Sequence, residues 1–86
     1  MEEPTEGLIP LYGFLEGDTL GLLVLAYKAD TITRLAERLQ QSARVRVAYR
    51  SSVKVVYKGR ELAPELTIET AGIEPLERFD VVSREG

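Results

Sequence analysis

The sequence predicts an α+β domain in which one helix packs against a β-sheet of four to five strands. Several short segments have the period-two alternation or the continuous apolar character of β-strands, whereas one segment has the apolar period of an amphipathic helix. A single apolar stripe on a single helix requires a sheet to cover it. The 86 residues have the length of one domain, residues 1–86, and we expect residues 1–7 to form a flexible N-terminal tail.

The first two predicted strands form a hairpin. Leu8 to Leu15 and Thr19 to Lys28 are apolar at nearly every position, and the turn cluster Glu16-Gly17-Asp18 separates them. Such strands are either covered on both faces or carry an additional apolar patch. Pro10 has no N–H to donate, so it favours an edge position or the beginning of a strand.

The segment ADTITRLAERLQQSA, which starts at Ala29, predicts the helix. Asp30 or Thr31 can cap its first turn. The apolar residues recur at i, i+3, i+4 and i+7 and form one stripe, made of Ile32, Leu35, Ala36 and Leu39. The polar side, which we expect to face solvent, carries Arg34, Glu37, Arg38, Gln40 and Gln41.

Shorter elements follow the helix. Alternation at Val53, Val55 and Tyr57 predicts a strand, whereas residues 43–50 fit either a strand or a loop. A second, short extended segment is expected at Glu61-Leu62, after a turn at Gly59.

The stretch TIETAGIEPLERFDVV predicts how the sheet is completed. It begins with one helical turn from Thr67 to Ala71, which Gly72 ends in a left-handed conformation. Ile68 and Ile73 are expected to fix this turn to the core. A closing strand from Arg78 to Ser83 then places alternate residues in the core.

The residue types that the chain lacks limit its chemistry. The sequence has no Cys and no His, which excludes thiolate ligands, Cys nucleophiles and the usual general base near neutral pH. The acidic pairs Glu16/Asp18 and Glu74/Glu77 have no partner base, so we interpret them as residues that keep loops soluble. We therefore expect no catalytic residue, no metal site, no cofactor and no enzymatic activity of the isolated chain.

Targeting signals are also missing from the sequence. The start, MEEPTEG, has neither the basic nor the apolar region of a signal peptide. The longest apolar run, LGLLVLAY, is far shorter than the roughly 20 residues that span a bilayer. We expect a cytoplasmic protein that does not act at a membrane.

The order of the predicted elements resembles the β-grasp fold of ubiquitin, in which a mixed sheet wraps around one helix. The resemblance is most specific from Val55 to Val82, which reads VVYKGRELAPELTIETAGIEPLERFDVV. Covalent conjugation by ubiquitin-like proteins needs a flexible tail that ends in Gly-Gly. This sequence ends VVSREG, so we expect no conjugation.

Positions in the first turn, the helix and the closing segment point to a narrower family. They are Phe14, Glu16 and Asp18, then Asp30, Ala36, Glu37 and Arg38, then Thr67, Ile68, Gly72, Ile73, Pro75, Asp80, Val81 and Val82. In these positions the chain resembles the toluene monooxygenase system protein B family, which are small ubiquitin-like subunits of multicomponent diiron aromatic hydroxylases. The sequence departs from the family between Ser42 and Ser52, where it reads SARVRVAYRSS.

The family resemblance implies a non-catalytic accessory subunit. Such a subunit docks on the large diiron catalytic subunit and supports its assembly, while carrying no iron itself. An alternative that the fold permits is a stand-alone ubiquitin-like adaptor protein, for example one linked to a bacterial secretion system.

Basic residues concentrate in the middle of the chain. Lys28 to Arg60 contains nine basic and two acidic residues, so this segment carries +7 and the remainder −10 of the net −3. Such a dipole can orient an acidic protein partner, and a solvated face of mixed charge explains it equally well. The residues we expect to contact a partner are Arg34, Arg38, Arg44, Arg46 and Arg50. Nucleic acid is disfavoured because the isoelectric point is about 5.0.

Overall fold

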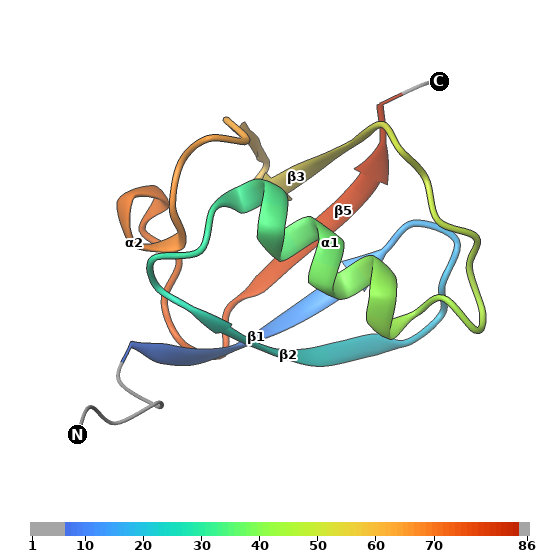
Figure 1. Ribbon diagram of the computed structural model, residues 1–86, viewed down its shortest axis with the longest axis horizontal. Coiled ribbons are helices and arrows are strands. Elements are labelled where there is room, and N and C mark those ends of the chain that lie inside the picture. The colour runs from blue at the N-terminus through green and yellow to red at the C-terminus, as the bar shows by residue number, and fades with distance from the viewer. Residues whose placement is uncertain (1–6, 85–86) are drawn as a thin grey trace.

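A computed structural model describes residues 7–84 as five strands, one long helix and one short helix (Figure 1). The elements are β1 (Leu8–Leu15), β2 (Gly21–Tyr27), α1 (Ile32–Ser42), β3 (Val53–Tyr57), β4 (Arg60–Leu62), α2 (Ile68–Ala71) and β5 (Arg78–Ser83). The bounds predicted for the first and the closing strand are confirmed. β2 is shorter than predicted at both ends, because the residues that flank it belong to turns. The tail predicted for residues 1–7 lies, except for Gly7, outside the described residues.

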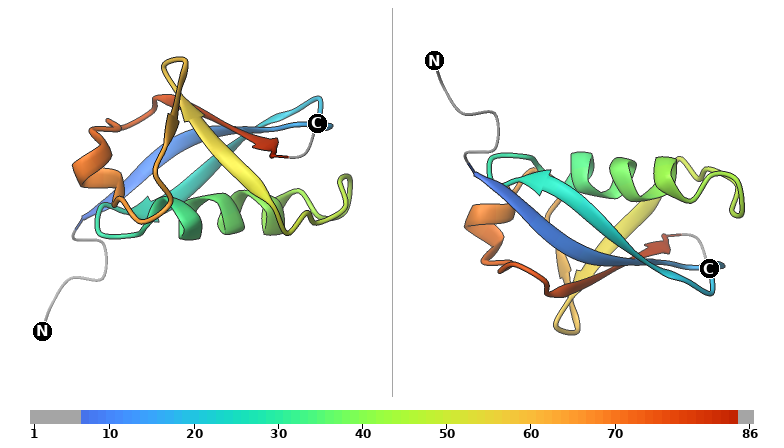
Figure 2. Two further views of the ribbon diagram at one scale, coloured as in Figure 1. Left: turned by 90° about the horizontal axis from the view of Figure 1, so that it is seen from above. Right: turned by 90° about the horizontal axis from the view of Figure 1, so that it is seen from below.

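The strands form one mixed sheet with the order β2-β1-β5-β3-β4. β1 runs parallel to β5, with Tyr12 beside Arg78 and Leu15 beside Val81, and all other neighbouring strands are antiparallel. The first and the closing strand therefore lie side by side within the sheet, and β2 and β4 form its edges (Figures 1 and 2). Pro10 precedes the residues of β1 that pair with β5, so its missing N–H removes no bond from that ladder.

The sequence predicts either Asp30 or Thr31 as the N-cap of α1, and the structure distinguishes the two. The Thr31 hydroxyl accepts the N–H of Arg34 at 3.1 Å, whereas the carboxylate of Asp30 accepts the N–H of Tyr27 at 3.0 Å. Thr31 is therefore the cap, and Asp30 closes the turn before it. The predicted apolar stripe is confirmed, because all four of its residues are buried: Ile32, Leu35, Ala36 and Leu39.

The position of Gln40 differs from the one predicted for it on α1. It was expected to face solvent, yet it is 2% exposed. Its side-chain Nε2 donates to the carbonyl of Arg50 at 2.9 Å, and its Oε1 accepts the N–H of Arg50 at 2.9 Å. A buried amide is tolerated here because both of its polar ends have partners. Residues 43–52 lie outside any strand, which confirms a loop, and Gln40 holds the far end of this loop against α1.

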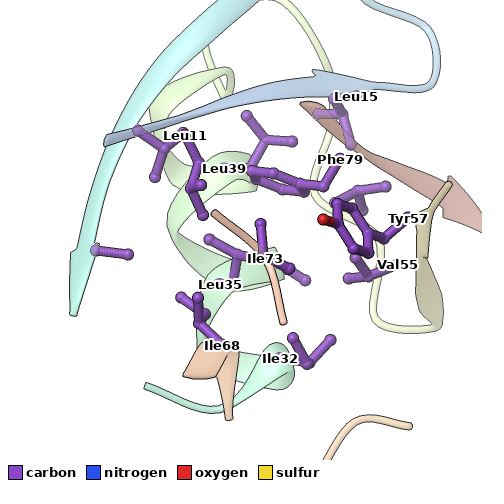
Figure 3. Close-up of a cluster of buried hydrophobic side chains, with 14 of the residues drawn as sticks. Leu11, Leu15, Ile32, Leu35, Leu39, Val55, Tyr57, Ile68, Ile73 and Phe79 are labelled. Atoms are coloured by element: carbon purple, nitrogen blue, oxygen red, sulfur yellow. The ribbon is translucent and has the colours of Figure 1, made fainter. Parts of the chain in front are cut away.

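The core lies between α1 and the inner face of the sheet. Figure 3 shows side chains of α1, of the strands and of the segment around α2 converging in a single cluster. All predicted core residues belong to it, with Leu22 half-buried at its margin: Leu22, Val24, Val55, Ile68, Ile73 and Val81. A Cβ atom on Gly13 would lie 2.7 Å from the Phe79 ring and 2.9 Å from Leu39. The glycine thus lets α1 approach the centre of the sheet.

The segment before β5 folds as its sequence predicts. The Thr67 hydroxyl accepts the N–H of Thr70 at 3.1 Å, and Thr70 Oγ1 accepts the N–H of Thr67 at 2.9 Å. Gly72 ends α2 with φ of 80°, the left-handed conformation that glycine adopts without strain. Ile68 and Ile73, on either side of this turn, are both buried.

We predict that Leu35→Ala lowers the free energy of unfolding by about 2 to 5 kcal/mol, because it opens a cavity beneath the centre of the helix. Leu35 is fully buried. Val45→Ala is the control, since Val45 is 84% exposed and should change stability by no more than about 0.5 kcal/mol. Urea denaturation measures both variants, and equal effects of the two would contradict the helix packing described above.

Candidate docking surface

The five arginines expected to contact a partner do not form one surface. Arg46 lies in the loop 43–52 and is bound to the β1–β2 turn. Its Nε and Nη2 atoms donate to the Asp18 carboxylate at 3.0 and 2.9 Å, and the Asp18 side chain is 2% exposed. This bidentate hydrogen bonding raises the pKa of Arg46 and holds the pKa of Asp18 below its ordinary value. Arg46 therefore fixes the loop to the hairpin.

Arg50 makes a second connection between the same two segments. Its Nη1 atom donates to the carbonyl of Glu16 at 3.0 Å and lies 3.8 Å from the Glu16 carboxylate. That carboxylate also accepts the N–H of Ser83 at 2.6 Å. The acidic pair Glu16/Asp18, which the sequence suggested to be solubilising, thus binds the loop 43–52 and the end of β5.

The other three arginines lie on α1 or just after it. Arg34 and Arg44 are exposed, and no ion pair to either is found within residues 7–84. Arg38 is 38% exposed and lies 3.5 Å from the Asp30 carboxylate. Arg38 and Arg44, with Gln41 and Ser42, line a shallow groove of about 560 Å³ whose other wall is β2 at residues 23–25.

An apolar face covers the outer side of the β1–β2 hairpin. We define this hairpin outer face as Leu8, Pro10, Tyr12 and Phe14 of β1 with Gly21, Leu23, Leu25 and Tyr27 of β2. None of these eight positions carries a charge. Leu23 and Leu25 are 56% and 53% exposed, and both tyrosines are also exposed. The sequence predicts that these strands are either covered on both faces or carry an additional apolar patch. The structure shows the additional patch.

Phe14 marks the end of the hairpin outer face towards β5. A Cβ atom on Gly21 would lie 2.5 Å from its ring, so the ring lies directly over that glycine. The Arg78 guanidinium stacks on Phe14 with 4.0 Å between its carbon and the ring centroid, and Arg78 Nε bonds Asp80 at 2.9 Å. A charged pair therefore borders the apolar face on this side.

The second acidic pair also has a structural role in the described chain. Glu77 accepts hydrogen bonds from the Tyr57 hydroxyl and from the N–H of Glu74, and its carboxylate lies 3.6 Å from Lys58 Nζ. The Tyr57 hydrogen bond is the main reason that the pKa of Glu77 is lowered, and burial raises the pKa of Tyr57. Among residues 7–84, no three acidic side chains gather where they could hold a metal ion.

Neither helix in the described part of the chain is long and apolar enough to cross a membrane. Two features of the described surface could contact a protein partner. These are the groove beside Arg38 and Arg44 and the adjoining hairpin outer face.

Comparisons with known proteins agree with this fold. Residues 8–82 match the family model of toluene-4-monooxygenase system protein B, and no curated protein matches the sequence. A chain in a structure of the toluene 4-monooxygenase HD complex with the inhibitor 4-bromobenzoate is 27% identical, with a TM-score of 0.83 over 90% of this chain and 99% of that chain. The ubiquitin of Caldiarchaeum subterraneum is 17% identical, with a TM-score of 0.76 over 93% of this chain and 98% of that chain. The ubiquitin-like β-grasp fold is thereby confirmed.

We predict that Asp18→Asn lowers the melting temperature at pH 7, because the substitution removes the charge that binds Arg46. The pKa of Asp18 is lower in the folded than in the unfolded chain, so its contribution is complete above the ordinary aspartate value of about 3.9. The contribution is lost as the pH falls through the depressed value. Thermal unfolding of both proteins between pH 7 and pH 2 should show the difference shrinking in acid, and a constant difference would contradict this role.

Proposed function

This chain belongs to the toluene-4-monooxygenase system protein B family, and on that premise we propose that it is a small accessory subunit of a multicomponent diiron aromatic monooxygenase. The subunit acts by docking on the large catalytic subunit. The proposal is carried by the similarity to a chain of a toluene 4-monooxygenase complex, which extends over 99% of that chain. The fold alone would not suffice, because ubiquitin-like domains serve many functions.

The side chains support a role without chemistry of its own. The sequence contains no His and no Cys, so carboxylates would have to supply any iron ligands. Within residues 7–84, the buried carboxylate of Asp18 binds Arg46, and Glu77 binds Tyr57 and Lys58. Among residues 7–84 no three acidic side chains gather where they could hold an ion, which supports assigning the metal and the reaction to the large subunit. The cytoplasmic location stays a prediction.

The proposed docking side combines an apolar centre with a basic border. The hairpin outer face supplies exposed leucines and tyrosines without any charge. Arg38 and Arg44 lie beside it across the β2 edge, and Arg34 lies one turn earlier on α1. Protein interfaces have this composition, with aromatic and arginine residues around a desolvated apolar centre. Arg46 and Arg50 contribute indirectly, because they hold the loop 43–52 in place.

Co-expression with the large catalytic subunit from the same host tests the proposal. Size-exclusion chromatography with light scattering should show one stable complex, in which iron stays with the large subunit after the two are separated. The isolated chain should hold no stoichiometric iron after dialysis against a chelator. Elution of the chain alone in the presence of the large subunit would instead favour the stand-alone adaptor and overturn the proposal.

We predict that Arg44→Glu weakens this complex about tenfold and flattens its salt dependence, because it replaces a docking cation by an anion. Arg60→Glu is the matched control, since Arg60 is an exposed arginine on the opposite edge strand, β4. Calorimetric titration at two salt concentrations measures both variants. An unchanged affinity for Arg44→Glu would move the interface to the acidic side of the domain.

A further inference from the structure

We propose that the open edge of β2 is the site at which an extended acidic segment of the partner pairs with this chain as an additional strand. The proposal rests on the proposed function only for the identity of the partner, the large catalytic subunit. The site is the β2 backbone from Leu23 to Leu25, together with the groove between that backbone and α1. Figure 1 shows β2 at the margin of the sheet below α1.

Within residues 7–84, the outward backbone groups of Leu23 and Leu25 at this margin have no hydrogen bond to another strand. Lys28 donates its N–H to the carbonyl of Gly7 at 2.8 Å, and residues of an antiparallel ladder alternate between facing towards and away from the neighbouring strand. The backbone N–H and C=O groups of Val24 and Ala26 therefore point to β1, whereas those of Leu23 and Leu25 point outwards. No other strand of residues 7–84 pairs with this side.

The two edges of the sheet differ in how they are protected. Edge strands usually avoid pairing with other chains by being short or by carrying charges or proline. β4 fits that rule, because it has three residues and two of them are Arg60 and Glu61. β2 has seven residues, GLLVLAY, with no charge and no proline. An unprotected apolar edge of this kind favours strand addition, in which the backbone supplies affinity and alternate side chains supply specificity.

The surroundings of the edge define the chemistry of the added strand. Successive side chains of a strand point to opposite faces of the sheet. Side chains on the helix side would enter the groove beside Arg38 and Arg44, which favours acidic residues. Side chains on the other side would extend the hairpin outer face beside Leu23 and Leu25, which favours apolar residues. The segment that fits therefore alternates acidic and apolar residues.

A second copy of this chain fits the edge less well. Pairing of β2 with β2 would place Arg38 and Arg44 of both copies along one seam. Like charges that face one another across neighbouring strands are destabilising. The apolar outer faces of the two copies would be compatible, but the arginines on the helix side would repel each other. We therefore assign the edge to an acidic segment of a different protein.

A peptide titration tests the edge independently of any hydroxylase. The probe is an acetylated and amidated heptapeptide of alternating Glu and Val, and the same peptide with Lys in place of Glu is its control. Amide NMR spectra of the full chain should show shifts at Leu23 and Leu25 with the Glu peptide, and hydrogen exchange there should slow about tenfold. The Lys peptide should leave both amides unchanged. Equal shifts with both peptides, no shift with either, or a concentration-dependent dimer that uses this edge would overturn the proposal.

Variants separate the backbone contribution from the charge contribution. Leu25→Pro removes an outward N–H without removing a bond to β1, and Leu25→Val retains that N–H as the matched control. The proline variant should weaken Glu-peptide binding about tenfold, while the valine variant should stay within about twofold. If Leu25→Pro does not fold in a thermal melt, hydrogen exchange of the Leu23 and Leu25 amides in the Glu-peptide complex tests the backbone contribution, and Arg44→Glu against Arg60→Glu tests the charge contribution. Undiminished peptide binding by a folded Leu25→Pro variant would contradict strand addition, and undiminished binding by Arg44→Glu would contradict an acidic occupant.

Hydrogen exchange in the assembled complex distinguishes this proposal from the proposed function. A complex in which Leu23 and Leu25 exchange as fast as in the free chain would overturn the edge site while leaving the accessory role intact. A chain that binds the Glu peptide at the edge but not the large subunit would support the edge site and overturn the accessory role.

Discussion

The packing of the α1 stripe onto the inner face of the sheet determines every other feature of this domain. Leu35 and Leu39 are buried to within 1% exposure, and Leu39 lies over the place where β1 and β5 are neighbours, near Gly13 and Phe79. Gly13 permits the close approach, because any side chain there would meet Leu39 and Phe79. Since one helix covers one face, the outer face of the sheet is left without a cover, and its composition is free to serve a partner.

The charged residues divide into two classes with different tasks. Arg46 and Arg50 cross from the loop 43–52 to the β1–β2 turn and bind Asp18 and Glu16 there, so the basic segment and part of the acidic remainder neutralise each other. Arg34 on α1 and Arg44 after it are exposed and have no ion pair within residues 7–84. The net dipole counted along the sequence therefore overstates the basic surface that a partner meets.

Local patterns were sufficient for the elements and insufficient for the site. The period of two in RFDVVS and the stripe in α1 depend on near neighbours, so both were predicted with their burial. Gln40 was misplaced because its partner, the Arg50 backbone, is ten residues away in a loop without periodicity. The pairing of Arg46 with Asp18 spans 28 residues and follows from tertiary structure alone. Likewise, the open edge follows from the strand order, which cannot be read from the order along the chain.

The parallel pairing of β1 with β5 also bears on how the domain forms during synthesis. β5 follows all other elements of residues 7–84 along the chain, yet it lies next to β1 within the sheet. Until it arrives, the β1–β2 hairpin and α1 have no central strand to pack around, and closure of the longest loop in the fold is delayed. A chain in which β5 has not yet formed thus exposes the inner side of its apolar hairpin, and we expect this side to be prone to association until β5 pairs with β1.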